Sequence, residues 1–87
     1  MFEYQVTIAR SAQKSLTKLP QSVCDRILEQ IDYLQTEPRP SGVRKLKGQT
    51  KSWRLRVGDY RIVYDVDDQA RQIDIVRIRH RQDVYKL

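Results

Sequence analysis

Apolar and polar residues alternate along residues 2–8, which read FEYQVTI. Side chains of a strand point alternately to its two faces, so this pattern predicts a strand with one apolar face. Residues 9–19 and 21–36 instead place apolar residues three or four positions apart, which predicts two amphipathic helices. Pro20 separates them, because proline disfavours a helical residue before it and suits the first turn of the next helix.

The second of these segments has the clearer periodicity. Its predicted buried stripe comprises Val23, Ile27, Ile31 and Leu34, widened by Cys24 and Leu28. Two short helices joined at a proline are expected to form a hairpin that lies on a sheet.

The second half of the chain predicts a run of hairpins. A loop with two prolines and a glycine spans residues 38–42, and strands are expected at 52–57, 60–66 and 72–79. The apolar phase of the last strand shifts between Ile75 and Val76, which indicates a bulge or burial on both faces. The predicted order is β-α-α-β-β-β in one domain, residues 1–87. We expect an α+β fold, with the helical hairpin on one face of a mainly antiparallel sheet.

The central hairpin turns at Gly58-Asp59, where glycine at the first loop position suits a type II′ turn. With this turn, Arg56 faces Arg61 and Leu55 faces Ile62. Opposed residues share a face. One face then carries Trp53, Leu55, Val57, Tyr60, Ile62 and Tyr64 and is predicted to be buried, whereas the other carries Arg54, Arg56 and Arg61.

Basic charge is concentrated in this region. Residues 39–61 hold eight Lys or Arg and one acid, a net charge of +7, whereas the chain as a whole carries +6. Like charges directly opposite one another destabilise a sheet, and an anion bound between them would relieve the repulsion. Arginine also suits bidentate contact with phosphate. A solvated outer face is the plainer explanation, but the clustering without acids favours a phosphate-binding surface.

Composition excludes several classes of function. A single cysteine, Cys24, permits no disulfide within the chain, and one His with one Cys cannot form a structural zinc site. No apolar run approaches the about 20 residues of a membrane span, and the first residues lack the apolar run of a signal peptide. We therefore expect a cytoplasmic protein with an acidic partner, either nucleic acid or protein, and with no metal or cofactor.

The C-terminal residues 79–85 read RHRQDVY. If the last strand lies beside residues 60–66, Arg79 approaches Arg61. A phosphate site with arginines, one imidazole and one tyrosine has the groups for acid–base chemistry on RNA. His80 can also be a surface residue, and Tyr85 can simply pack the chain end on the sheet.

Here the sequence resembles a family. KLKG at 45–48, WRLRVGDYRIVYDV at 53–66 and the terminal RHRQDVY, together with the order of elements, resemble the RelE/ParE superfamily of bacterial toxins over nearly the whole chain. The RelE branch comprises ribosome-dependent mRNA endonucleases that cut the codon in the ribosomal A site without a metal. The resemblance implies such an activity, a RelB-like antitoxin from a neighbouring gene, and contact with operator DNA only through that antitoxin.

The resemblance also implies roles for individual residues. The basic residues of the hairpin and the last strand would act on the 2′-hydroxyl and the scissile phosphate, and the terminal tyrosine would stack on or orient a nucleotide. These residues are Arg54, Arg56, Arg61, Arg79 and Tyr85. Well-known RelE members carry lysine where this chain has Arg54 and Arg56, and arginine is a poor proton acceptor. His80 is therefore the expected acid or base.

Further basic residues are expected to bind RNA or the ribosome. They are Arg44, Lys45, Lys47, Lys51, Arg77 and Arg81.

Two other functions remain open. A ParE-like toxin shares the fold but poisons DNA gyrase and need not be a nuclease. A catalytically silent module that binds nucleic acid or protein would fit the lack of a carboxylate pair or metal cluster.

Overall fold

The computed structural model of the chain describes residues 3–46, 48 and 51–80. Its elements are β1 (Gln5–Ile8), α1 (Arg10–Thr17), α2 (Gln21–Tyr33), β2 (Arg44–Lys45), β3 (Ser52–Val57), β4 (Tyr60–Asp67) and β5 (Gln72–His80). The strands form one sheet in the order β1-β5-β4-β3-β2. β1 runs parallel to β5, and the other neighbouring pairs are antiparallel. The predicted α+β class with a mainly antiparallel sheet is confirmed.

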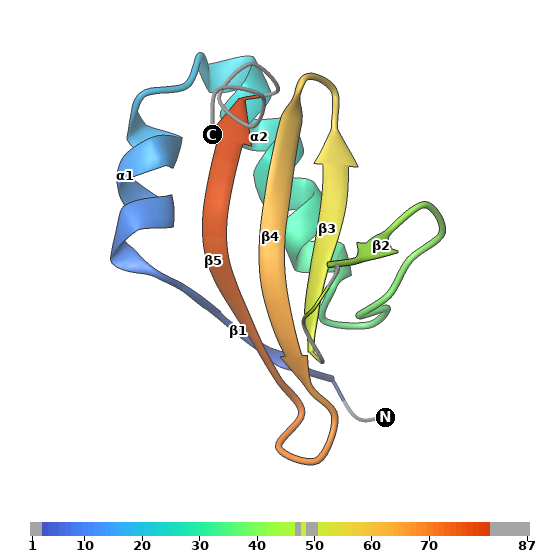
Figure 1. Ribbon diagram of the computed structural model, residues 1–87. Coiled ribbons are helices and arrows are strands. Elements are labelled where there is room, and N and C mark those ends of the chain that lie inside the picture. Colours follow the sequence, from blue (N-terminus) through green and yellow to red (C-terminus); the bar gives the residue numbers. More distant parts are fainter. Residues whose placement is uncertain (1–2, 47, 49–50, 81–87) are drawn as a thin grey trace.

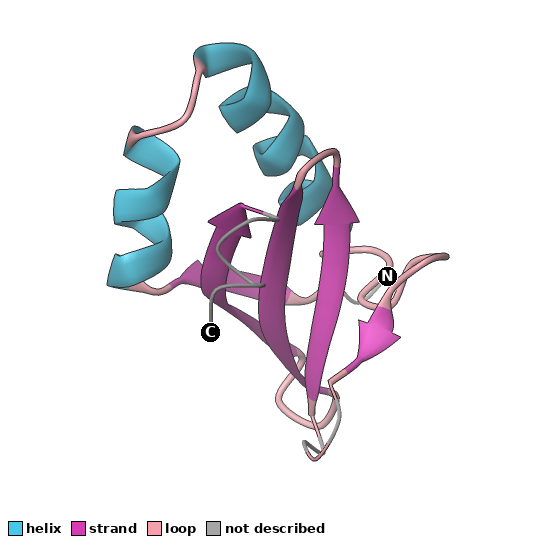
Figure 2. Ribbon diagram, turned by 45° about the horizontal axis from the view of Figure 1, so that its top comes forward, coloured by secondary structure: helices cyan, strands magenta, loops and turns pink. Residues whose placement is uncertain are grey.

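The two helices lie on different parts of the sheet (Figures 1 and 2). α2 crosses behind β3 and β4, whereas α1 lies alongside β5. The face turned toward the viewer in Figure 1 carries neither helix. Within the described residues, no helix has both the length and the apolar character needed to span a membrane.

Buried side chains from both helices and from β3, β4 and β5 form one core. The core residues are Ala12, Ile27, Ile31, Leu34, Leu55, Val57, Ile62, Tyr64, Val66, Ile73, Ile75 and Ile78. Leu28 is not among them. Its side chain remains 41% exposed, so the predicted stripe of α2 is narrower than expected. Within α2 the buried residues are Ile27 and Ile31.

β2 is an element that the sequence pattern did not predict. It has only two residues, and it pairs antiparallel with β3 through Arg44 opposite Arg54 and Lys45 opposite Trp53. Both of its residues are exposed and basic, so the segment has no apolar alternation. Its strand conformation comes from backbone pairing with a neighbour, which no local pattern reports.

A bulge at Val76 interrupts the pairing of β4 with β5. Tyr64 lies opposite Ile75 and Val63 lies opposite Arg77, so Val76 has no partner in the ladder. In a regular strand Arg77 would have faced the core and Ile78 would have faced solvent. The extra residue reverses this, so that Ile78 is 5% exposed in the core and Arg77 is exposed. Of the two explanations for the phase shift at Ile75 and Val76, a bulge or burial on both faces, the bulge is confirmed.

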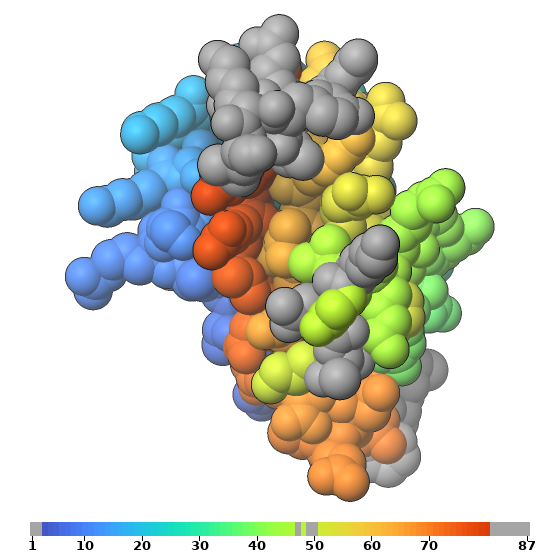
Figure 3. All heavy atoms as spheres, in the orientation of Figure 1, coloured from blue at the N-terminus to red at the C-terminus, as the bar shows by residue number. Residues whose placement is uncertain are grey.

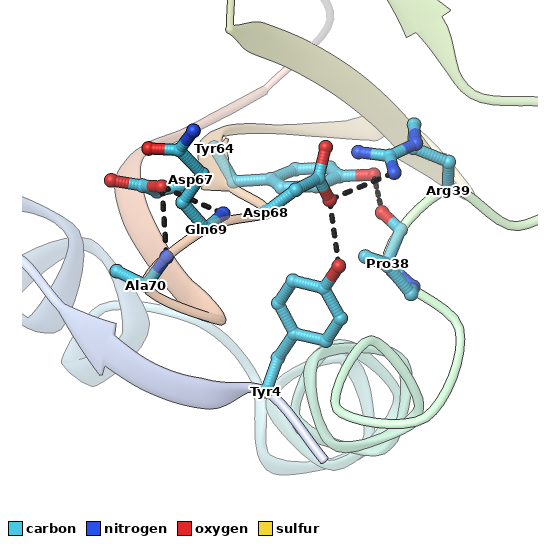
Figure 4. Close-up of polar contacts among 8 residues, drawn as sticks. All are labelled: Tyr4, Pro38, Arg39, Tyr64, Asp67, Asp68, Gln69 and Ala70. Atoms are coloured by element: carbon cyan, nitrogen blue, oxygen red, sulfur yellow. Dashed lines mark hydrogen bonds and ion pairs between the residues drawn. The ribbon is translucent and has the colours of Figure 1, made fainter. Parts of the chain in front are cut away.

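Polar contacts hold the end of the sheet opposite the Gly58-Asp59 turn (Figure 4). The Asp68 carboxylate accepts hydrogen bonds from the Tyr4 hydroxyl at 2.6 Å and from Arg39 at 2.9 Å. These two donors hold the pKa of Asp68 below its usual value, the Tyr4 hydrogen bond contributing most. The Arg39 guanidinium also lies over the Trp53 ring, 5.6 Å from its centroid. Three segments distant in sequence are joined in this way.

Tyr64 anchors the same loop from within the core. Its hydroxyl donates a 2.7 Å hydrogen bond to the carbonyl oxygen of Pro38, as Figure 4 shows. Burial of the ring raises the pKa of Tyr64 to about 12. Together with Arg39, this contact fixes the start of the loop that leads to β2.

Candidate functional site

The hairpin of β3 and β4 has the register that the sequence predicted. Val57 pairs with Tyr60, Arg56 with Arg61, and Leu55 with Ile62. Gly58 has a φ of 59°, and Arg71 is the only non-glycine residue with positive φ in the described part of the chain. Asp59 therefore has negative φ, as the second loop residue of a type II′ turn requires.

Two rows of arginines cross the sheet on the face that carries no helix. Arg56, Arg61 and Arg79 lie opposite one another across β3, β4 and β5. Arg44 lies opposite Arg54 in the second row, which continues through Val63 on β4 to Arg77 on β5. Opposed residues share a face, so the six side chains belong to one surface, which we call the arginine face: Arg44, Arg54, Arg56, Arg61, Arg77 and Arg79.

The space-filling view places this face in the molecule. In Figure 3 the surface of β3, β4 and β5 lies between blue α1 on one side and the green segment that contains β2 on the other. The arginine face is therefore flanked by two elements of the same chain.

A hollow of about 390 Å³ opens on the arginine face. Its lining consists of Gly42, Arg44, Arg54, Arg56 and Arg61. Gly42 has a φ of 94°, which side chains other than glycine rarely adopt, so it allows the loop before β2 to turn beside the hollow. The sequence marked Gly42 as a loop residue but gave no sign that it borders the arginines.

The guanidinium groups of this hollow have few partners among the residues that the structure describes. Arg56 Nε donates to the carbonyl oxygen of Gly58 at 3.1 Å, which holds that side chain at the turn. Arg61 Nε is buried and has no hydrogen-bond partner among the described residues. Within the described part of the chain the one ion pair is Arg39 with Asp68, so no described carboxylate pairs with the arginine face.

A buried donor without a partner costs about 1–3 kcal/mol. A bound oxyanion would accept from Arg61 Nε and would also reduce the repulsion between Arg56 and Arg61. The hollow therefore has the chemistry of a site for a phosphate group.

Two carboxylates lie at the border of the arginine face, on the same side of the sheet. Asp65 lies directly opposite Asp74, two pairs along the ladder from Val63 and Arg77. The Ser52 hydroxyl donates to Asp65 at 2.5 Å, and the Thr7 hydroxyl donates to Asp74. The surface charge thus changes sign along the strands, and the positive region is confined to the half of the sheet near Gly58.

The structure does not bring His80 to the arginine face. His80 pairs with Tyr60 in the ladder, and their rings meet edge to face at an interplanar angle of 83°. Tyr60 packs against the core, on the face that α2 covers. The expected position of His80 among the arginines is therefore wrong. Arg79 and His80 are consecutive residues of a strand, and consecutive side chains point to opposite faces.

The predicted lysines are also placed apart from the hollow. Lys45 lies opposite Trp53, so it is on the other face from Arg44. Lys51 is exposed and precedes β3, at the end of the hairpin away from the turn, where its carbonyl accepts from Val66 N–H. Lys47, Arg81 and Tyr85 lie outside the described residues.

Comparison with known proteins identifies the family. A family model described as the ParE toxin of the type II toxin-antitoxin system, parDE, matches residues 6–85. The RelE1 protein of Methanocaldococcus jannaschii is 33% identical over 87 residues, which cover 97% of each chain. Toxin RelG of Mycobacterium tuberculosis is 30% identical over 84 residues, which cover 95% of this chain and 97% of RelG.

The fold gives the same result. The structure resembles a chain of the archaeal RelE-RelB complex from Pyrococcus horikoshii with a TM-score of 0.82 and 36% identity. The match covers 90% of this chain and 94% of that chain. The protein is therefore a toxin of a type II toxin–antitoxin system and belongs to the RelE-like branch of the RelE/ParE superfamily.

Proposed function

We propose that this toxin is a ribosome-dependent endoribonuclease that arrests translation by cutting mRNA within the codon in the ribosomal A site. The observation that carries the proposal is the hollow lined by Arg44, Arg54, Arg56 and Arg61. Arg61 Nε, which is buried and has no partner among the described residues, supports the binding of an oxyanion at that place. The proposal locates the protein with ribosomes in the cytoplasm.

The proposed reaction is an in-line attack of a ribose 2′-oxygen on the adjacent phosphorus. The new O2′–P bond forms as the P–O5′ bond breaks, the 2′-hydroxyl loses its proton, and the leaving 5′-oxygen gains one. The products are a 2′,3′-cyclic phosphate and a 5′-hydroxyl, and no metal takes part. Negative charge builds on the phosphoryl oxygens in the transition state, and preorganised cations stabilise it there.

Arginine supplies charge and geometry in this scheme but no proton transfer, because its pKa lies above about 12. Arg54, Arg56 and Arg61 would hold the phosphoryl oxygens, and Arg79 would extend the same row. Tyr85 keeps its expected role of stacking on or orienting a nucleotide. Catalysis then rests on alignment and electrostatics more than on a titrating side chain of the sheet.

A cognate RelB-like antitoxin is the proposed partner. RelE chains similar to this one were solved in complexes with RelB, from Pyrococcus horikoshii and, as RelBE2, from Mycobacterium tuberculosis. An acidic segment of the antitoxin that covers the arginine face would neutralise it and exclude RNA. Contact of the toxin with operator DNA would be indirect, through the antitoxin.

Poisoning of DNA gyrase is the second candidate. It is favoured by the ParE description of the matching family model and by the position of His80, which leaves the described arginine face without an imidazole.

A translation reaction with purified toxin separates the two candidates. The proposal expects new mRNA 5′ ends within codons, only when ribosomes are present, and expects Arg61→Gln to lose them. Intact mRNA together with trapped gyrase–DNA cleavage complexes would establish the second candidate. Intact mRNA and unaffected gyrase would indicate the silent binding module.

A further inference from the structure

A second hollow, of about 370 Å³, lies between α1 and β5. Its lining consists of Ser11, Ser15, Arg77, Ile78 and Arg79. It shares no residue with the first hollow, yet the two are neighbours, because Arg79 lies directly opposite Arg61. The arginine face thus continues from one hollow into the other.

The bulge of β5 builds this second hollow. The extra residue Val76 turns Arg77 and Arg79 outward together, so both reach the arginine face. The Ser11 hydroxyl of α1 lies 3.3 Å from the Val76 carbonyl oxygen and donates to it, which ties the helix to the bulge. Bulges next to functional sites commonly re-aim side chains in this way.

The lining has the chemistry of an anion site. Its described residues offer two guanidinium groups and two hydroxyls, and none of them is a carboxylate. Ser15 donates to the Ser11 carbonyl oxygen, a helical contact that a hydroxyl can exchange for an external acceptor by rotating. Neither Arg77 nor Arg79 forms an ion pair with a described carboxylate. Paired guanidinium and hydroxyl donors match the several acceptor oxygens of a phosphate.

We propose that the hollow between α1 and β5 is a second phosphate subsite, which binds a phosphodiester of RNA while the first hollow holds the scissile phosphate. The inference rests on the proposed function and extends it to the length of RNA that the toxin contacts. The hollows lie on either side of the β4–β5 pair, about two strand spacings or 10 Å apart. The bound phosphodiester comes either from the same mRNA strand or from ribosomal RNA.

The test uses the full-length toxin and variants that block one hollow. Ser15→Glu places a carboxylate in the second hollow, where it would pair with Arg77 or Arg79. Ser22→Glu, at an exposed position on α2, is the matched control with the same change of charge. Arg77→Gln is a second variant of the hollow at an exposed position, and thermal melts verify that each variant is folded.

The first measurement is binding of 2′-O-methyl RNA, which cannot be cleaved by its own 2′-oxygen. A hexanucleotide can fill both hollows, whereas a dinucleotide has one phosphodiester and can fill only one. We expect Ser15→Glu and Arg77→Gln to lower the affinity for the hexanucleotide about tenfold or more, because a charge-assisted phosphate contact is among the stronger hydrogen bonds. The affinity for the dinucleotide should fall by less than about threefold. The slope of log affinity against log salt should become shallower by about 0.7 for each phosphate that the variant no longer binds.

The second measurement is binding to programmed ribosomes, which identifies the source of the phosphodiester. If ribosomal RNA fills the hollow, the two variants bind the hexanucleotide normally but bind ribosomes more weakly than Ser22→Glu does. Equal affinities of wild type, Ser15→Glu and Ser22→Glu in both measurements would overturn the inference, as would equal losses in Ser15→Glu and Ser22→Glu.

Failure of the proposed function has a different signature. Arg61→Gln removes a guanidinium from the first hollow and should lower the affinity for the dinucleotide and for the hexanucleotide alike. If Arg61→Gln binds both as the wild type does, the arginine face does not bind RNA, and the proposed function fails together with the inference. If Arg61→Gln loses affinity and Ser15→Glu does not, only the second subsite is wrong.

Discussion

The ring of His80 packs edge-on against the ring of Tyr60, with 5.0 Å between the two centroids. This contact places the imidazole on the covered face of the sheet, while its neighbour Arg79 belongs to the arginine face. A residue that the sequence marked for proton transfer is therefore separated from the site by the thickness of the sheet.

The first prediction concerns this histidine. His80→Gln should lower single-turnover cleavage on saturated ribosomes by far less than the about 10²-fold that a general acid or base provides. The pH profile of cleavage should stay unchanged, and removal of the ring packing should lower the melting temperature slightly. A loss of 10²-fold or more with an altered pH profile would show that His80 reaches the substrate after all.

The second prediction concerns the centre of the first hollow. Under the proposed function, Arg61→Gln should reduce the single-turnover rate of cleavage by about 10²–10³-fold, as the removal of one oxyanion donor does in known enzymes. Its melting temperature should be equal to or above that of the wild type, because a repulsion with Arg56 is removed. Lys18→Gln is the matched control: it removes one positive charge at an exposed position after α1 and should cleave normally.

Tyr64 provides a prediction on alkaline stability. Its pKa is about 12 in the folded protein against an ordinary 10.0, so the unfolded chain ionises first as the pH rises. The free energy of unfolding that Tyr64 contributes is complete below pH 10 and is lost between about pH 10 and 12.

The test compares Tyr64→Phe with Tyr33→Phe, in which the deleted hydroxyl is on an exposed ring. Tyr64→Phe leaves the Pro38 carbonyl without its donor and should cost about 1–3 kcal/mol in urea unfolding at neutral pH. It should also show a shallower fall in stability above pH 10. Tyr33→Phe should match the wild type in both respects, and an equally steep alkaline fall in Tyr64→Phe would contradict the assignment.

Asp68 provides the corresponding prediction in acid. Its pKa is held below the ordinary 3.8, so the stabilisation is present above that pH and is lost as the pH falls through the lower, folded value. Asp68→Asn should cost no more than about 1 kcal/mol at neutral pH, because both partners are partly exposed and salt screens them. The acid fall of stability should become shallower than in Asp32→Asn, an exposed control on α2.

Local patterns were enough to predict the hairpin and the bulge. The two-residue turn at Gly58-Asp59 fixes the register of β3 and β4, and the register then places every side chain by simple alternation. The shift of apolar phase at Ile75 and Val76 marks the bulge, because Ile75 and Ile78 both need the core. These features depend on residues close together in the chain, which a sequence displays directly.

The features that local patterns do not predict depend on pairing between distant segments. β2 exists because its backbone meets β3, and this pairing puts Arg44 on the arginine face and Lys45 on the other. The position of His80 follows from strand alternation, which places it on the face opposite to Arg79. The expectation that His80 lies among the arginines came instead from the chemistry of the imidazole. The serines of α1 gave no signal, because polar residues on a helix ordinarily face water.

The parallel pairing of β1 with β5 determines when, during synthesis of the chain, the sheet can be completed. Gln5 pairs with Gln72 and Ile8 with Ile75, so the first strand has to wait for the last one before the sheet is complete. Contacts of such long sequence separation form slowly and late in folding. A nascent chain that still lacks β5 therefore has no complete sheet and no arginine rows that span it. Under the proposed function, the site that acts on the ribosome is therefore complete only after β5 has been made.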